Sequence, residues 1–177
     1  KPKGILHTTG GYLTQVAAQS GAVELIVARS GAPALVSHAA GAGAVRIGFE
    51  SDAITVDAHR TLAAAVADAP ASLVGVSGLV QQLREVKDDD EVALLRRACT
   101  IGDLALSQII GQGVIRAGST EREVARALEW EMYRLGADAI AFETIVAAGP
   151  NSAIPHHRPT QTVLADGDFV KIDFGAV

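Results

Sequence analysis

The first part of the chain, residues 1 to about 80, alternates short apolar runs with loops of small residues. Runs of this length and composition are typical of β-strands. The predicted strands are residues 25–28, 34–36, 45–49 and 73–76. An Ala-rich segment, 57–67, predicts a helix between the last two of them. Strands that alternate with helical segments favour an α/β layer in this part of the chain.

A long amphipathic helix is predicted to begin near residue 88. Residues 88–91 are all acidic, and acidic side chains suit a helix N-terminus because the helix dipole favours negative charge there. Apolar or small residues then recur at spacings of three and four over about twenty positions. These residues are Val92, Leu95, Cys99, Gly102, Leu106 and Ile109. The pattern predicts that they form one buried stripe, and that Gly111 and Gly113 end the helix.

A second helix is predicted from Thr120 to Gly136. The Thr120 hydroxyl can cap the first turn, and Glu123, three residues later, can complete a capping box. The apolar face of this helix is predicted to hold Val124, Leu128, Met132 and Leu135. Met132 and Trp130 are interpreted as packing residues, and Gly136 is expected to terminate the helix.

Two strands, 143–147 and 169–174, are predicted near the end of the chain, with a turn at 166–168. The two-residue period of a strand places Val170, Ile172 and Phe174 on one face. Asp173 is therefore predicted to face away from the apolar layer. Taken over the whole chain, the pattern predicts an α/β (α+β) protein.

A change in composition at residues 83–91, which are mostly charged, indicates a domain boundary. We therefore predict two domains, 1–82 and 83–177. The last residues, 170–177, have the pattern of a strand that enters further structure. From this pattern we expect the chain to be a segment of a longer protein.

Composition and charge narrow the classes of function. With 49% hydrophobic residues among 177, the chain can bury a core. The net charge is −5 and Lys and Arg are not clustered, which argues against nucleic acid or a membrane surface as partner and favours a small molecule. No apolar run approaches the ~18 residues of a membrane span. The single cysteine, Cys99, is interpreted as a buried residue of a cytoplasmic protein.

Asp173 is the first residue with candidate chemistry. An aspartate inside a strand is costly unless it is paired or bound to a metal ion. Lys171, two residues away on the same face, is one possible partner. A divalent metal ion is the other, because such ions bind carboxylates readily and pairs of them are common in hydrolases.

The adjacent residues His156 and His157 are the second candidate. Pro155 and Pro159 flank them and stiffen the loop. Adjacent side chains of an extended segment point in different directions, so at most one imidazole is expected to enter a site. Histidine is the commonest proton shuttle near neutral pH, but a surface pair without function explains the sequence equally well.

These segments together resemble the Xaa-Pro peptidase group of the pita-bread metallopeptidases, family M24, which includes prolidase and aminopeptidase P. The resemblance is carried by residues 142–152 (FETIVAAGPNS), 155–159 (PHHRP) and 168–176 (DFVKIDFGA). Residues 83–98 are similar to the start of the catalytic domain, and 12–15 (YLTQ) resemble the creatinase-like N-terminal domain. The resemblance implies a partial creatinase-like domain followed by the first half of a pita-bread domain.

The resemblance also implies roles for individual residues. Asp173 matches the first of five metal ligands, and the others would lie beyond Val177. His156 matches a histidine that contacts substrate and can move a proton, and His157 is a further candidate for substrate binding. The complete protein would then hold two divalent ions (Mn, or Co or Zn), bind proline-containing peptides and form a cytoplasmic homodimer. The 177-residue segment alone is expected to bind no metal tightly and to be inactive.

Two alternatives to the peptidase interpretation remain open at the level of sequence. One is a metal-free hydrolase of the creatinase type, and another is a non-catalytic peptide-binding module on the same fold. Within the peptidases, the sequence does not decide between an Xaa-Pro dipeptidase and an Xaa-Pro aminopeptidase.

Overall fold

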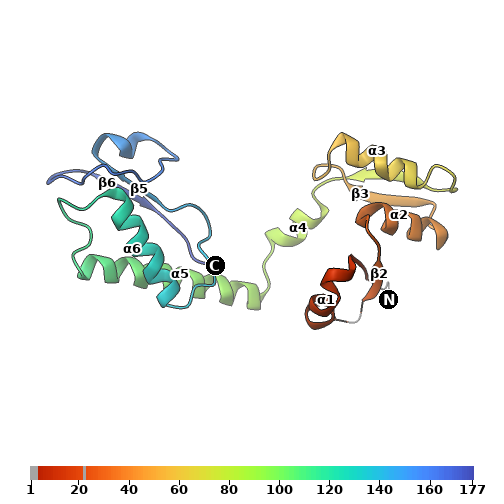
Figure 1. Ribbon diagram of the computed structural model, residues 1–177, viewed down its shortest axis with the longest axis horizontal. Helices are drawn as coiled ribbons and strands as arrows, with labels where there is room; N and C mark the ends of the chain where they lie inside the picture. The colour runs from red at the N-terminus through yellow and green to blue at the C-terminus, as the bar shows by residue number, and fades with distance from the viewer. Residues whose placement is uncertain (1–3, 22) are drawn as a thin grey trace. The chain divides into compact units, whose positions relative to one another are not determined.

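The computed structural model describes residues 4–21 and 23–177, and it divides the chain into two compact units at Val86 and Lys87 (Figure 1). The boundary predicted between residues 82 and 83 falls inside helix α4 (Leu79–Glu85). The first three residues of the predicted domain 1–82 lie outside the described residues.

The first unit alternates strands and helices. Strand β1 pairs with β2, and β3 pairs with β4, in both cases in parallel. The elements in chain order are β1 (Ile5–Thr8), η1 (Gly10–Tyr12), α1 (Leu13–Gln19), β2 (Glu24–Val27), α2 (Gly31–Gly41), β3 (Arg46–Glu50), α3 (Val56–Ala65), β4 (Ser72–Val76) and α4. The strands predicted at 25–28, 45–49 and 73–76 and the helix at 57–67 are confirmed. The sequence pattern missed β1, α1 and α4.

The apolar run 34–36 lies in α2, so the strand predicted there is wrong. A run of three apolar residues does not by itself distinguish a strand from a turn of buried helix. Pro33 stands in the first turn of α2, where a backbone N–H has no partner within the helix. The lack of an N–H in proline therefore costs no helical hydrogen bond. The helix is rich in alanine, which favours this conformation, and it buries Val36 against Leu62 and Val66 of the α3 region.

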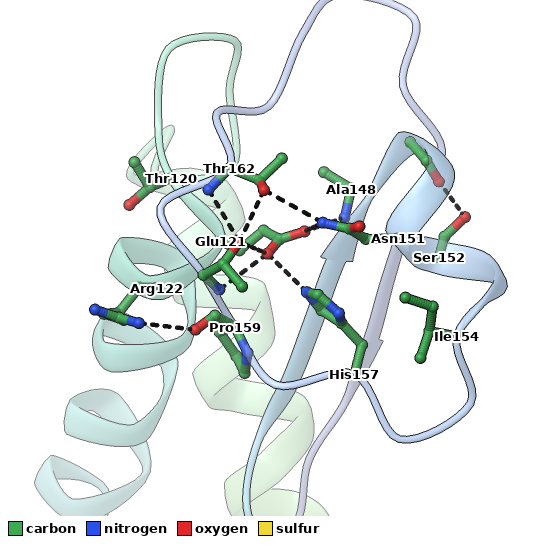
Figure 2. Close-up of polar contacts among 12 residues, drawn as sticks. Thr120, Glu121, Arg122, Ala148, Asn151, Ser152, Ile154, His157, Pro159 and Thr162 are labelled. Carbon is green, nitrogen blue, oxygen red and sulfur yellow. Dashed lines mark hydrogen bonds and ion pairs between the residues drawn. The ribbon is translucent and has the colours of Figure 1, made fainter.

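The second unit contains two helices and an antiparallel pair of strands. Its elements are α5 (Asp89–Gly111), α6 (Glu121–Arg134), β5 (Ile145–Ala148), the 3-10 helix η2 (Gly149–Ala153) and β6 (Val170–Asp173). In the strand pair, Ile145 stands opposite Asp173 and Ala148 opposite Val170. Helix α6 packs between α5 and strand β5, so its N-terminal end lies close to the end of β5 (Figures 1 and 2).

Both helices of the second unit begin where the sequence predicts. Asp88 and Glu91 form a capping box at the start of α5, and Thr120 and Glu123 form another at the start of α6. Each box satisfies two N–H groups that the helix itself leaves unpaired. The glycine at 136, which has a φ of 100°, follows α6 as expected, because this left-handed conformation is costly for residues with a side chain.

The core of the second unit lies between α5, α6 and the strands. Its buried side chains include Ile109, Val124, Leu128, Met132 and Val146. Partly buried residues of β6 and the position after it pack against this core, namely Val170, Ile172 and Phe174. The predicted facing of β6, with Asp173 on the opposite side, is therefore confirmed.

The N-terminal part of α5 does not follow the predicted stripe. Leu95 is 52% exposed and Cys99 is also exposed, whereas Ile101, Gly102, Ala105 and Ile109 are buried. At ~1.5 Å per residue, α6 is too short to cover the whole of α5, so only the C-terminal part of α5 is buried. The packing role predicted for Met132 is confirmed, but Trp130 is 71% exposed.

Within residues 4–21 and 23–177, no helix is long and apolar enough to cross a membrane.

Candidate active site

The predicted site residues meet at one open pocket in the second unit. Its volume is about 590 Å³. The residues that line it are Phe142, Glu143, Ile145, His156, His157, Arg158 and Asp173. The pocket thus brings His156 and His157, from the loop after η2, to the side of Asp173 at the end of β6.

Asp173 presents an exposed carboxylate to this pocket. Among the residues that the structure describes, no hydrogen bond or ion pair engages this carboxylate. Lys171 does not pair with it, because the Lys171 amine donates to the carbonyl oxygens of Ile154 and Pro155. Both belong to the loop of residues 149–160 that carries His156 and His157, which we call the histidine loop. Of the two partners considered for Asp173, Lys171 is therefore ruled out by the structure.

The two histidines differ in their surroundings. His156 is exposed at the pocket, whereas His157 is buried, with 9% of its surface exposed. The Nε2 atom of His157 lies 2.8 Å from Oε2 of Glu121. Both residues line the pocket, but only His157 is tied to the body of the unit through its imidazole.

Glu121 is the centre of the polar network beside the pocket, and Figure 2 shows its side chain between α6 and the loop that carries His157. Its carboxylate is fully buried. Oε1 accepts hydrogen bonds from the Ala148 N–H and the Asn151 amide, both at 2.9 Å. Oε2 accepts from the Thr160 N–H at 3.0 Å and the Thr160 hydroxyl at 2.8 Å, in addition to the contact with His157.

This network keeps Glu121 ionised although it is buried. Burial raises the pKa of the carboxyl group, but the hydrogen bonds from Ala148, Asn151, His157 and Thr160 outweigh burial and lower the pKa to about 2. Glu121 is also the first residue of α6, where the helix dipole favours a negative charge. The site therefore contains a buried anion beside the histidine loop at neutral pH.

We expect this anion to make stability depend on pH. Its lowered pKa stabilises the fold fully above the ordinary glutamate value of 4.5, and the contribution is lost as the pH falls toward about 2. At neutral pH the contribution is at most about 3 kcal/mol of unfolding free energy. Urea unfolding of the wild type and Glu121→Gln, at several pH values between about 2 and 5, measures it.

The expected result is a stability difference between the two proteins that shrinks as the pH falls. Glu129→Gln, on the same helix but outside this network, is the matched control and is expected to stay within about 0.5 kcal/mol of the wild type. A difference between the wild type and Glu121→Gln that stays constant across this pH range would contradict the role of the Glu121 charge.

Sequence reasoning did not find Glu121. Its position just after the capping Thr120 is fully explained by helix initiation, because acidic residues are common in a first turn. Its partners lie 27 to 39 residues away along the chain. The only signal in the sequence is that two acids follow Thr120 where the capping box requires just one.

A second pair of charges lies at the pocket. Arg158 and Glu143 form an ion pair of 3.0 Å, and both side chains are largely exposed. An exposed pair of this kind contributes little to stability. Because both residues line the pocket, the pair places a positive and a negative group beside it.

The described residues do not by themselves complete a metal site. Over residues 4–21 and 23–177, no three side chains of the His, Cys, Asp or Glu type are placed to hold a metal ion together. The pocket offers Asp173 as an unengaged carboxylate, which is a suitable donor for a hard or borderline divalent ion. A stable centre would need more ligands than this one.

Comparison with known families now defines the class of protein. Residues 93–177 match the model of metallopeptidase family M24, and residues 1–86 match that of the creatinase/prolidase N-terminal domain. The chain belongs to metallopeptidase family M24. This confirms the expected fold, a creatinase-like domain followed by part of a pita-bread domain.

Particular relatives agree with this assignment. An uncharacterised peptidase of Bacillus subtilis, YqhT, is 36% identical over 134 residues, which are 76% of this chain and 37% of the relative. The solved Xaa-Pro dipeptidase of Bacillus anthracis is 33% identical with a TM-score of 0.85, covering 96% of this chain and 47% of that one. The X-Pro aminopeptidase of Thermotoga maritima is 33% identical with a TM-score of 0.82, covering 97% and 47%. The chain spans less than half the length of each of these proteins.

Proposed function

We propose that the complete protein hydrolyses peptide bonds to the nitrogen of proline with the help of divalent metal ions. The observation that carries this proposal is that His156 and the unengaged carboxylate of Asp173 line the same pocket although they come from different elements. Similarity to an Xaa-Pro dipeptidase and an X-Pro aminopeptidase supports the choice of substrate. Phe142 and Ile145 give the pocket an apolar wall that suits a pyrrolidine ring.

In this proposal Asp173 supplies one carboxylate ligand, and the remaining ligands come from residues of the complete protein outside this 177-residue segment. Two divalent ions, with Mn preferred and Co or Zn as alternatives, would supply an activated water at neutral pH. Within this chain, the task of Asp173 is to present its oxygen atoms at the end of β6. The segment alone is expected to bind these ions only weakly, because one carboxylate does not form a centre.

His156 and His157 act on the substrate side of the pocket in this proposal. His156 is exposed on a loop that is held in place, so its imidazole can contact the peptide and move a proton at the scissile bond. His157 lines the same pocket, but its Nε2 contacts Glu121, which leaves it mainly to shape the wall.

The alternatives from the sequence make different predictions. A non-catalytic peptide-binding module has no need for an unengaged carboxylate beside a histidine, so the pocket favours a hydrolase. A metal-free hydrolase of the creatinase type would work without Asp173 as a metal ligand. Dipeptidase and aminopeptidase activities are distinguished by the peptide length accepted.

The wider organisation of the complete protein also belongs to this proposal. We expect a cytoplasmic homodimer, on the resemblance to the Xaa-Pro peptidase group. Residues 1–82 would form the creatinase-like domain and residues 83–177 the first half of the catalytic domain.

The test is an assay of the complete protein, after removal of metal with EDTA, on an Xaa-Pro dipeptide, an Xaa-Pro tripeptide and the matching Xaa-Ala peptides. Added Mn²⁺ is expected to restore cleavage of Xaa-Pro peptides by at least ~10³-fold, because the metal lowers the barrier by several kcal/mol. The 177-residue segment serves as the control and is expected to remain inactive. Full activity of the metal-free protein would contradict the proposal, and so would equal cleavage of the Xaa-Ala peptides.

A further inference from the structure

We propose that Glu121 is a positioning residue that holds the histidine loop, residues 149–160, so that His156 faces the pocket. This inference rests on the proposed function for the role of His156. The loop begins where β5 ends and returns to the N-terminal end of α6, and Glu121 lies between these two points (Figure 2).

The two carboxylate oxygens of Glu121 bind opposite ends of the loop. Oε1 binds the last residue of β5 and the start of the loop, through the Ala148 N–H and the Asn151 amide. Oε2 binds its end, through His157 and both the N–H and the hydroxyl of Thr160. One side chain thereby joins both ends of the loop to α6.

The geometry of these contacts makes them specific for a carboxylate. Three of the five contacts come from N–H groups that only donate, and the Thr160 hydroxyl and His157 Nε2 can donate as well, so two accepting oxygens suit all five. A glutamine has one accepting oxygen, and its amide would place N–H groups against the donors at one end of the loop. Charged hydrogen bonds of this kind are about twice as strong as neutral ones.

The place of His156 follows from the restraints on its neighbours. His157, the next residue, is fixed by Glu121 on one side of the loop. On the other side, Lys171 of β6 donates to the carbonyl oxygens of Ile154 and Pro155, just before His156. Because the residues on both sides are held, His156 keeps its position at the pocket without a hydrogen bond to Glu121 itself.

The decisive variant is Glu121→Gln in the complete protein, with Glu131→Gln as the matched control. Glu131 is on the same helix and is also buried, but its carboxylate binds Arg134 and not the loop. We expect Glu121→Gln to lower kcat/KM on an Xaa-Pro dipeptide by about 100-fold, since small misplacements of a reacting group can cost this much. Glu131→Gln is expected to lower it by less than about 3-fold, because the loop is untouched.

Two further measurements separate positioning from general stability. Hydrogen exchange at the Ala148 and Thr160 amides is expected to accelerate at least ~10-fold in Glu121→Gln and to stay unchanged in Glu131→Gln. In a His156→Ala background, Glu121→Gln is expected to lower kcat/KM by less than about 3-fold further, because residues that act as a unit are not additive.

Three results would overturn the inference. The first is that hydrogen exchange at both amides is unchanged in Glu121→Gln. The second is that Glu121→Gln exchanges faster but has the same kcat/KM as Glu131→Gln, and the third is that Glu121→Gln still lowers kcat/KM ~100-fold in the His156→Ala background. If the wild type does not cleave Xaa-Pro peptides, the proposed function fails. The exchange measurement still decides whether Glu121 holds the loop.

Discussion

Asp173→Asn is expected to abolish most of the activity of the complete protein, lowering kcat by at least ~10³-fold, because loss of bound metal removes several kcal/mol of barrier lowering. Asparagine keeps the size of the side chain and one carbonyl oxygen but removes the charge that attracts a divalent ion. The metal content after dialysis, measured by inductively coupled plasma mass spectrometry, is expected to fall together with kcat.

The fold is expected to survive this substitution. Asp173 is exposed, and no hydrogen bond or ion pair within the described part of the chain depends on its carboxylate. A change of less than about 0.5 kcal/mol in unfolding free energy is typical for such a position. Asp166→Asn, in the turn before β6 and away from the pocket, is the control and should retain both metal and activity. If Asp173→Asn kept its metal and its turnover, the ligand assignment would be wrong and the metal-free alternative would gain support.

His156→Ala is expected to lower kcat on Xaa-Pro peptides by about 10² to 10⁴-fold, the usual contribution of a positioned proton-transfer group. The metal content is expected to stay that of the wild type, because His156 is assigned to the substrate and not to the metal. The two variants therefore differ in a measurable way, since only Asp173→Asn is expected to lose metal.

The control for His156→Ala is His59→Ala, which removes an exposed imidazole in the first unit. It is expected to leave kcat unchanged, because the His59 ring packs against Phe49 in a tilted arrangement and takes no part in the pocket. Turnover of His156→Ala equal to that of the wild type would remove His156 from the mechanism. A loss that appears only in KM would limit His156 to substrate binding.

The histidine pair shows how far local sequence can go. The sequence indicates that two adjacent imidazoles in an extended loop point in different directions, but it does not say which one enters a site. The structure shows that His157 turns to the buried Glu121 and that His156 stays exposed at the pocket. The choice depends on a carboxylate 36 residues earlier in the chain.

The sequence by itself determined the features that depend on near neighbours. The acidic run 88–91 predicted the start of α5, and the capping box of Thr120 and Glu123 predicted the start of α6, because both signals lie within a few residues of the helix end. The apolar period of α6 predicted its buried face, and the two-residue period of β6 predicted that Asp173 lies opposite the core. The motifs around His156 and Asp173 were enough to indicate the family.

Only the tertiary structure decided the features that depend on packing between distant segments. Cys99 and Trp130 are exposed because no other element packs against their parts of α5 and α6 in the described structure. The helical period predicts which residues share a face, but not how much of that face another element covers. The bonds of Lys171 to the histidine loop, and of Glu121 to both ends of that loop, join residues at least 16 positions apart. Such contacts form only when the fold brings the segments together, so the residue that holds the candidate active site was visible only in three dimensions.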